Sequence, residues 1–292
     1  MTNAMVAHTA NHSRAAKALL ALVCGAFAAP LAHAQGKVDA HYKISMTGVT
    51  IGEIHWQIEI GDTLYTATAS GKASGVLSVL VNGEGTVVAQ GNIAAGQIEP
   101  SSFASTITDD DGTISLQMTF VDGIATERIA PQPPQHADRL PVTDADRRGV
   151  ADPLSAVLIT ARLGGGALAA SDCNRTLKIF DGRRRYNLLL SYGRMDKIEI
   201  ERGYKGPILV CGVVLQPIAG YRADSMIVKY VAGKHNMELW FAPIAGTSII
   251  APVRVLMPTL IGTLKIQADQ FEAAAAPATP APVEAAPLPP PH

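Results

Sequence analysis

Short segments in which apolar and polar residues alternate recur along most of this 292-residue chain. Residues 51–60 are the clearest example, because Ile54, Trp56 and Ile58 alternate with glutamate, histidine and glutamine. A period of two residues indicates a strand with one buried face. Turn signals separate such segments, as at 109–112, where Asp-Asp-Asp-Gly stands between two alternating runs. We therefore expect a mainly β protein, whose large antiparallel sheet curls into an open barrel or splits into a sandwich.

One segment departs from this pattern and predicts a short helix at about 152–163. Asp152 can cap the helix by accepting from free N–H groups of the first turn, and Pro153 fits the first helical position. Apolar residues between 154 and 161 recur with helical spacing, and three glycines at 164–166 favour the end of the helix. We expect the curled sheet to wrap around this one short helix.

Both ends of the chain differ in composition from the part between them. A basic stretch, an apolar run and a final Ala-His-Ala make residues 1–34 typical of a secretory signal peptide. The sequence thus predicts export to the periplasm, with cleavage after Ala34. Residues 273–292 are almost all alanine and proline, which is typical of a disordered tail. Between them we expect a single β-rich domain at 35–272.

Charge and hydropathy narrow the classes of partner. The formal net charge is −1 at pH 7, which gives no reason to expect nucleic acid as a partner. No apolar run in the mature chain reaches the length of a transmembrane helix. We expect a near-neutral exported domain without a transmembrane segment, and the oligomeric state stays open.

Cys173 and Cys211 are the cysteines that remain after cleavage. An even pair in an oxidising compartment predicts a disulfide. Two buried free thiols are the alternative, with redox or metal chemistry a further one. A zinc site with these two cysteines would need two more ligands, and the histidines show no paired spacing that would supply them.

No catalytic motif stands out in the mature sequence. Its four histidines are isolated, and none belongs to a metal-binding pattern: His41, His55, His136 and His235. The acidic run at 109–111 indicates a solvated hairpin tip, since calcium takes six to eight oxygen ligands and no glutamate follows at the required spacing. We therefore assign no catalytic residue and expect neither a metal nor another cofactor.

The most concentrated polar cluster is Arg183-Arg184-Arg185-Tyr186, which follows Asp181-Gly182 at a predicted hairpin. Arginines bind phosphate through forked N–H donors, so this cluster is the candidate site for a lipid head group or another partner. Strand alternation would place Arg184 on the face opposite Arg183 and Arg185. A plain hairpin with local ion pairs is the alternative.

Several short motifs occur in an order that resembles the DUF3108 family of exported bacterial proteins of unknown function. They are the opening segment 42–52, Tyr65 with Gly71 and Gly75, the helix start at 152–155, the turn at 180–182, and Trp240-Phe241 followed by 252–255. The resemblance spans residues 40–270 and implies a periplasmic, mainly antiparallel β protein of unassigned activity. It supplies no catalytic residues. A looser similarity in plan links such a chain to lipoprotein-localisation carriers and other envelope-integrity proteins, by analogy of fold alone.

These features favour a non-enzymatic periplasmic protein of the cell envelope. It would bind a lipid-like ligand, for which an apolar cleft beside the helix is the candidate, or an envelope protein partner. One alternative is an interaction or scaffold module that uses strand edges, the loop at 130–149 or the tail. Another is an envelope hydrolase, which would need an acid, a base and a nucleophile to converge in a pocket.

Overall fold

The computed structural model describes residues 35–74, 83–132, 138–162, 167–233 and 236–275. The predicted signal peptide, most of the predicted tail, His136, His235 and the glycines at 164–166 lie outside the described residues. No helix among the described residues is long and apolar enough to cross a membrane.

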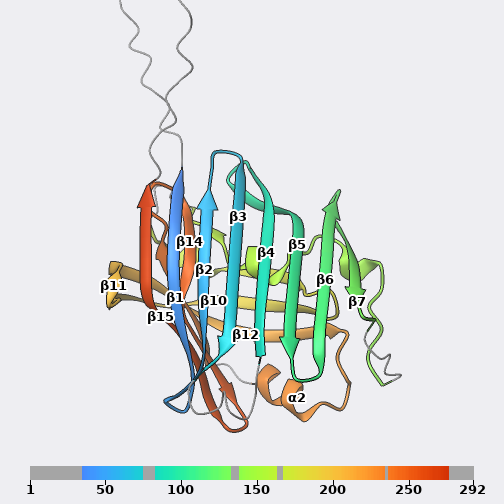
Figure 1. The fold of residues 1–292 in the computed structure, drawn as a ribbon. Coiled ribbons are helices and arrows are strands. Elements are labelled where there is room, and N and C mark those ends of the chain that lie inside the picture. The colour runs from blue at the N-terminus through green and yellow to red at the C-terminus, as the bar shows by residue number, and fades with distance from the viewer. Residues whose placement is uncertain (1–34, 75–82, 133–137, 163–166, 234–235, 276–292) are drawn as a thin grey trace, which may run out of the picture. The chain divides into compact units, whose positions relative to one another are not determined.

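Strands dominate the described part of the chain, as the alternation predicts (Figure 1). The first seven are β1 (Gly36–Met46), β2 (Val49–Ile60), β3 (Leu64–Ala73), β4 (Gly83–Ala94), β5 (Gln97–Asp109), β6 (Gly112–Val121) and β7 (Ile124–Ala130). The remaining strands are β8 (Ile159–Thr160), β9 (Arg175–Phe180), β10 (Arg185–Glu199), β11 (Arg202–Gly203), β12 (Lys205–Ala219), β13 (Met237–Pro243), β14 (Ile249–Thr259) and β15 (Gly262–Ala275). The helices are η2 (Ala145–Arg147), α1 (Pro153–Ala156), η3 (Ala170–Cys173) and α2 (Met226–Ala232), of which η2 and η3 are 3₁₀ helices.

All the strands belong to one sheet, in the order β7-β6-β5-β4-β3-β2-β1-β15-β14-β13-β12-β10-β9, with β8 beside β14 and β11 beside β15. Neighbours along this path are antiparallel. The first seven strands form one meander, which the pairing of β1 with β15 joins to the second half of the chain. The predicted fold class, a large curled antiparallel sheet, is confirmed.

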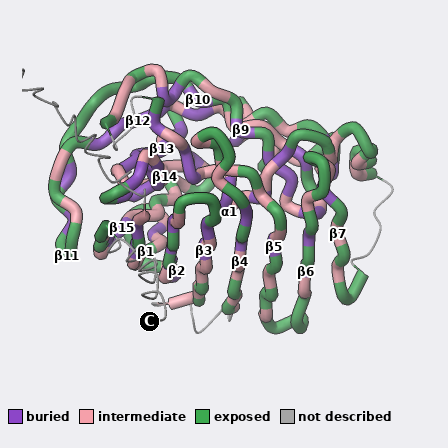
Figure 2. Tube along the Cα trace, turned by 90° about the horizontal axis from the view of Figure 1, so that it is seen from above, coloured by how far each residue is buried: buried purple, intermediate pink, exposed green. Residues whose placement is uncertain are grey.

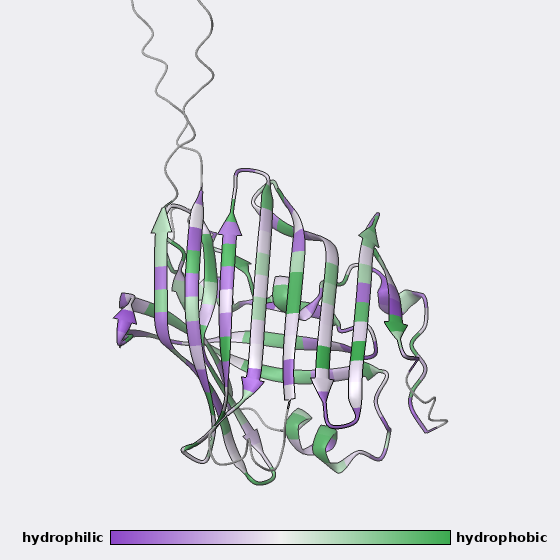
Figure 3. Ribbon diagram, in the orientation of Figure 1, coloured by the Kyte–Doolittle hydropathy of each residue, from purple (hydrophilic) through white to green (hydrophobic). Residues whose placement is uncertain are grey.

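The sheet curls back on itself and encloses a core. Seen from above, β1 to β7 form one side and β9, β10 and β12 the other (Figure 2). Inward side chains of both sides, such as Trp56 and Met118 with Phe180 and Val210, belong to one buried cluster. A second cluster lies against β9, β12 and β13, and includes Val231 of α2. Along β1 to β6, hydrophobic and hydrophilic bands alternate (Figure 3).

A closing segment (residues 147–151) bridges the two outer edges of the sheet. Arg148 forms a β-bridge with Ile124 of β7, and Ala151 forms one with Ile179 of β9. The backbone N–H of Gly149 donates to the carbonyl of Gly123 at 2.8 Å, on the β7 side. The edges of the sheet are thereby covered, which limits edge-to-edge association. The result is a nearly closed, barrel-like sheet.

The predicted helix at 152–163 is much shorter in the structure. Asp152 and Pro153 start it as expected, but α1 ends at Ala156 and the chain continues as strand β8. Leu158 belongs to the core inside the sheet, whereas Ile159 belongs to the second cluster. Extended backbone sends successive side chains to opposite sides, and a helix does not. Packing between two cores therefore overrides the local helical pattern.

The structure has a second α-helix, α2, although the sequence pattern predicts only one helix. The hydroxyl of Ser225 accepts from the N–H of Val228 and caps the helix. Gly233 follows its last residue. The apolar run at 226–232 fits a strand as well as a helix. The capping residue Ser225 and the glycine at 233 are the sequence signals that favour a helix here.

Cys173 and Cys211 form the predicted disulfide, and both residues are fully buried. Strand β15 runs to Ala275, three residues beyond the boundary predicted at 272, and these three residues pair with the start of β1.

Candidate functional site

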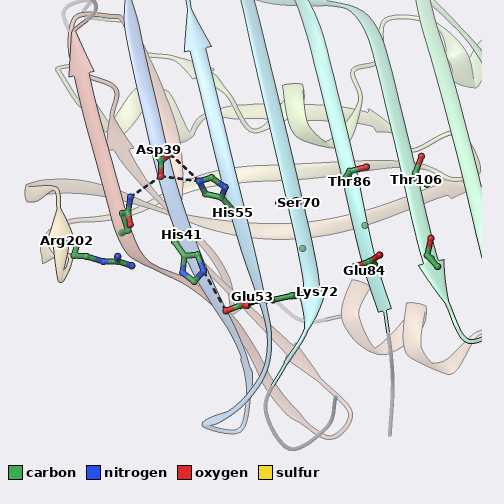
Figure 4. A pocket seen from close by; sticks show the side chains of 14 residues that line it. Asp39, His41, Glu53, His55, Ser70, Lys72, Glu84, Thr86, Thr106 and Arg202 are labelled. Atoms are coloured by element: carbon green, nitrogen blue, oxygen red, sulfur yellow. Dashed lines mark hydrogen bonds and ion pairs between the residues drawn. The ribbon is translucent and has the colours of Figure 1, made fainter. Parts of the chain in front are cut away.

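Two hollows of similar size lie on the described part of the chain. The first, of about 840 Å³, lies on the outward face of β1 to β5, the face opposite the core (Figure 4). Its lining is polar: Asp39, His41, Glu53, His55, Ser70, Gly71, Lys72, Glu84, Gly85, Thr86, Thr106, Thr108, Arg202 and Gln270. Strand alternation places Asp39, His41 and His55 outward, because their neighbours on β1 and β2 are buried in the core.

Asp39 is the centre of a hydrogen-bond network in this polar groove. Its carboxylate lies 3.1 Å from Nε2 of His55 and accepts from the amides of Gln57 at 3.2 Å and Gln270 at 2.9 Å. Burial alone would raise the pKa of Asp39, but the hydrogen bonds of Gln57 and His55 bring the net pKa below its usual value. The carboxylate is thus held in its charged form.

A β-bulge in β15 adds a second carboxylate to this face. The register between β1 and β15 shifts between His41 and Tyr42. Ala268 is buried, whereas Asp269 and Gln270 both contact outward side chains of β1. A bulge permits this, because an extra residue breaks the strict alternation. Asp269 Oδ1 lies 2.8 Å from Nδ1 of His41.

A hydroxyl residue lies beside His55 in this groove. Ser70 is directly opposite His55 in the β2–β3 pair, so Asp39, His55 and Ser70 have the residue types of a hydrolase triad. Nε2 of His55 lies within hydrogen-bond distance of both carboxylate oxygens of Asp39, at 3.1 and 3.2 Å. The described residues contain no group of three or more side chains arranged to hold a metal ion.

The second hollow is a cleft of about 830 Å³ beside α1, lined by both apolar and polar residues. Its apolar lining comes from β5, β6, the α1–β8 segment and β9: Ile98, Pro100, Phe120, Val150, Ala151, Ala156, Leu158, Ile159 and Leu177. Its polar lining is Asn92, Gln97, Glu99, Ser155, Thr160, Arg175, Thr176 and Lys178, with Asp122, Gly123 and Gly149 at the closing segment. The cleft thus combines an apolar wall with two cations.

Buried hydrogen bonds fix the helical wall of this cleft. Asp152 Oδ1 accepts from the N–H groups of Leu154 and Ser155, at 2.9 Å each. The hydroxyl of Tyr65 on β3 donates to Ser155 Oγ at 2.6 Å. Burial raises the pKa of Asp152, and burial also raises the pKa of Tyr65. This network ties α1 to the opposite side of the sheet, so the cleft wall is rigid.

Arg175 supports the opposite side of the cleft. Its guanidinium donates to the carbonyls of Asp172 at 2.7 Å and of Thr160 at 3.1 Å. Burial lowers the pKa of Arg175. Lys178 is exposed on the same strand. The cations Arg175 and Lys178 thus share the cleft lining with the acids Glu99 and Asp122.

A model of the DUF3108 family, described as a protein of unknown function, matches residues 41–269. The chain belongs to the DUF3108 family. A comparison with curated proteins finds no match. Among solved structures, the chain is similar to a β-barrel-like protein of the domain of unknown function DUF1849 from Brucella abortus. That alignment has 10% identity and a TM-score of 0.45, and covers 82% of this chain and 97% of the other.

The arginine cluster of this DUF3108 domain is dispersed in the structure. Arg185 is buried and donates to the carbonyl of Tyr186 and the side chain of Asn187. The Arg184 guanidinium lies 5.8 Å from the centre of the Tyr221 ring. Arg183 and Arg184 are in the turn, where their backbone N–H groups donate to the carboxylate of Asp181.

Tyr186, the last residue of the arginine cluster, packs against the second hydrophobic cluster. Burial raises the pKa of its hydroxyl. The four residues therefore do not present one surface, and a ligand role for them stays a prediction.

Sequence reasoning did not find most of the cleft in this DUF3108 domain. The helix start marks one wall, but Ile98, Pro100 and Phe120 come from strands far away in sequence. The inward position of these three residues follows from strand alternation, which the sequence shows. Their distance from α1 depends on how strongly the sheet curls, which local sequence does not encode.

Proposed function

We propose that this chain is an exported periplasmic protein of the cell envelope that binds a lipid-like ligand and has no catalytic activity of its own. The cleft beside α1 carries this proposal, because it joins an apolar wall to the cations Arg175 and Lys178. Its volume lies in the range typical of small-molecule sites, about 300–1,000 Å³. The buried disulfide is consistent with an oxidising compartment.

Contact with the apolar side chains of the cleft would contribute to affinity. Each methylene that leaves water contributes about 0.8 kcal/mol. A chain segment of about six methylenes would therefore contribute about 5 kcal/mol, which corresponds to a factor of several thousand in binding. Ion pairs between an anionic head group and the two cations would orient the ligand but add little affinity. The reason is that Lys178 is exposed and solvent screens its charge.

Retained lipid gives the direct test. Protein purified from the periplasm should release a stoichiometric lipid on organic extraction, detected by mass spectrometry. Thr160→Trp should abolish retention, because Thr160 lines the cleft and an indole in its place would occupy part of the cleft volume. Thr126→Trp is the matched control, since Thr126 is exposed on β7.

Absence of lipid from the wild type, together with no thermal shift on adding lipids, would refute the proposal and favour a protein partner instead. Equal retention by wild type and Thr160→Trp would place the ligand elsewhere. Cell fractionation tests the compartment: the mature protein should be periplasmic, with Gln35 as its first residue.

A further inference from the structure

Two β-hairpins end side by side on the described chain. The β1–β2 turn and the β14–β15 turn form paired hairpin tips (residues 46–49 and 259–262). The N–H of Thr47 donates to the carbonyl of Thr263 at 3.2 Å, and the Met46 backbone pairs with Leu264. Both tips lie at the lower end of the view in Figure 1, the end opposite the β2–β3 and β6–β7 turns.

Apolar side chains are exposed at these tips although polar residues would be the norm in a turn. Ile261 is 77% exposed, Leu260 51% and Val49 48%. The sequence contains no charged residue at 44–52 or at 255–264. Single exposed apolar residues need no explanation, but a shared apolar tip without charge indicates an interaction site.

Positive charge lies behind the tips. Lys265 is exposed and pairs in register with Ser45, and Lys43 lies two residues further along the same face of β1. Lys43 Nζ lies 3.0 Å from a carboxylate oxygen of Asp269, which offsets its charge. The positive charge of Lys265 is therefore the more important of the two for an anionic surface. Lys265 lies four positions after Ile261, about 13 Å along an extended chain. This spacing fits a phosphate layer above a shallow apolar insertion.

We propose that the paired hairpin tips dock this protein on a phospholipid bilayer, with Leu260, Ile261 and Val49 inserted between head groups and Lys265 at the phosphates. A protein partner fits less well, because stable protein interfaces bury about 1,200–2,000 Å² and two turns offer far less. A bilayer accepts a small convex tip without a complementary pocket. This inference rests on the proposed function in one respect: it names the surface from which the lipid-like ligand would be taken.

Vesicle flotation tests the docking. The full mature chain should bind vesicles of phosphatidylethanolamine and phosphatidylglycerol, and the double variant Leu260→Ser/Ile261→Ser should bind at least about tenfold more weakly, because two exposed apolar side chains lose their burial. The matched control is Leu64→Ser/Val121→Ser, which changes residues that are 61% and 66% exposed at the opposite end of the sheet. The control should bind like the wild type.

Charge and depth are tested separately. Lys265→Gln should weaken binding about fivefold on these anionic vesicles and leave binding to pure phosphatidylcholine unchanged. Ile261→Trp should shift its emission to the blue when vesicles are added, and Leu64→Trp should not.

Wild-type protein that does not float with vesicles would overturn the proposal, as would equal losses in tip and control variants. A wild-type dimer that becomes a monomer in the tip variant, without vesicle binding, would assign the tips to a second copy. The two proposals fail separately: Thr160→Trp should lose lipid retention but still float, and the tip variant should float weakly but keep any lipid already in the cleft.

Discussion

The ion pair between Arg147 and Glu127 makes closure of the sheet testable. Arg147 belongs to the closing segment, and its Nη2 and Nε donate to the two carboxylate oxygens of Glu127 on β7 at 2.5 and 3.0 Å. The same guanidinium lies 5.7 Å from the centre of the Phe180 ring at the end of β9. The Glu127 hydrogen bonds, together with electrostatics, raise the pKa of Arg147 although burial lowers it. One side chain thus connects both edges of the sheet.

Burial decides the size of the effect. The side chains of Arg147 and Glu127 are 23% and 19% exposed, so solvent screens the pair only in part. Hydrogen bonds to charged groups contribute about 1.5–3 kcal/mol, and fully exposed pairs about 0.2–1 kcal/mol. We expect Arg147→Ala to lower the free energy of unfolding by about 2–3 kcal/mol, of which about 1.5 kcal/mol or more is coupling to Glu127.

Urea denaturation of wild type, Arg147→Ala, Glu127→Gln and the double variant measures this coupling. Arg147→Lys is the control that keeps the charge but lacks the fork, and it should recover less than half of the loss. Native-state hydrogen exchange should accelerate at the N–H groups of Gly149 and Ala151, which bridge to the two edges. Coupling below about 0.5 kcal/mol, or exchange that is unchanged at those amides, would refute the closing role.

Three further predictions concern stability. Replacing Cys173 and Cys211 together by alanine should cost about 4 kcal/mol on the chain-entropy model for a separation of 38 residues; a loss below about 1 kcal/mol in urea denaturation would contradict it. Leu158→Asp should unfold the protein by burying an unpaired charge, so a folded variant by circular dichroism would argue against the core role of Leu158. The pKa values of Asp39 and Asp269 are lowered, since hydrogen bonds outweigh burial. The stability that these two carboxylates give the folded protein should therefore be present above about pH 4 and be lost as pH falls further. The urea midpoint of Asp269→Asn should drop less between pH 6 and pH 3 than that of the wild type.

Alternation predicted the strands well because each strand has one face on the core, and this constraint is local. It failed at Asp269, where two successive residues of β15 point outward. A bulge is set by the pairing of β1 with β15, whose sequences are more than 200 residues apart. The polar groove therefore could not be assembled from the sequence, although both of its histidines were noted as isolated residues.

The arginine cluster shows how little adjacency in sequence says about a shared surface. Three arginines beside one another in sequence suggest one charged surface, and strand alternation already separated Arg184 from its neighbours. The structure adds that burial and backbone carbonyls occupy Arg185. Clustering in sequence is thus weak evidence for a site when local contacts hold the side chains in different places.

The end of the first helix links the fold to the proposed function. In a helix continued to residue 163, Leu158 and Ile159 would not point to opposite sides. One of the two hydrophobic clusters would then lack its side chain from this segment. Because the chain instead becomes extended after α1, Leu158 and Ile159 pack on opposite sides, and β8 joins the edge of β14. The same change brings Thr160 opposite the β4–β5 turn. The early end of the helix places Leu158, Ile159 and Thr160 in the lining of the cleft, so the residue pattern that predicted a longer helix also contributes to the candidate site.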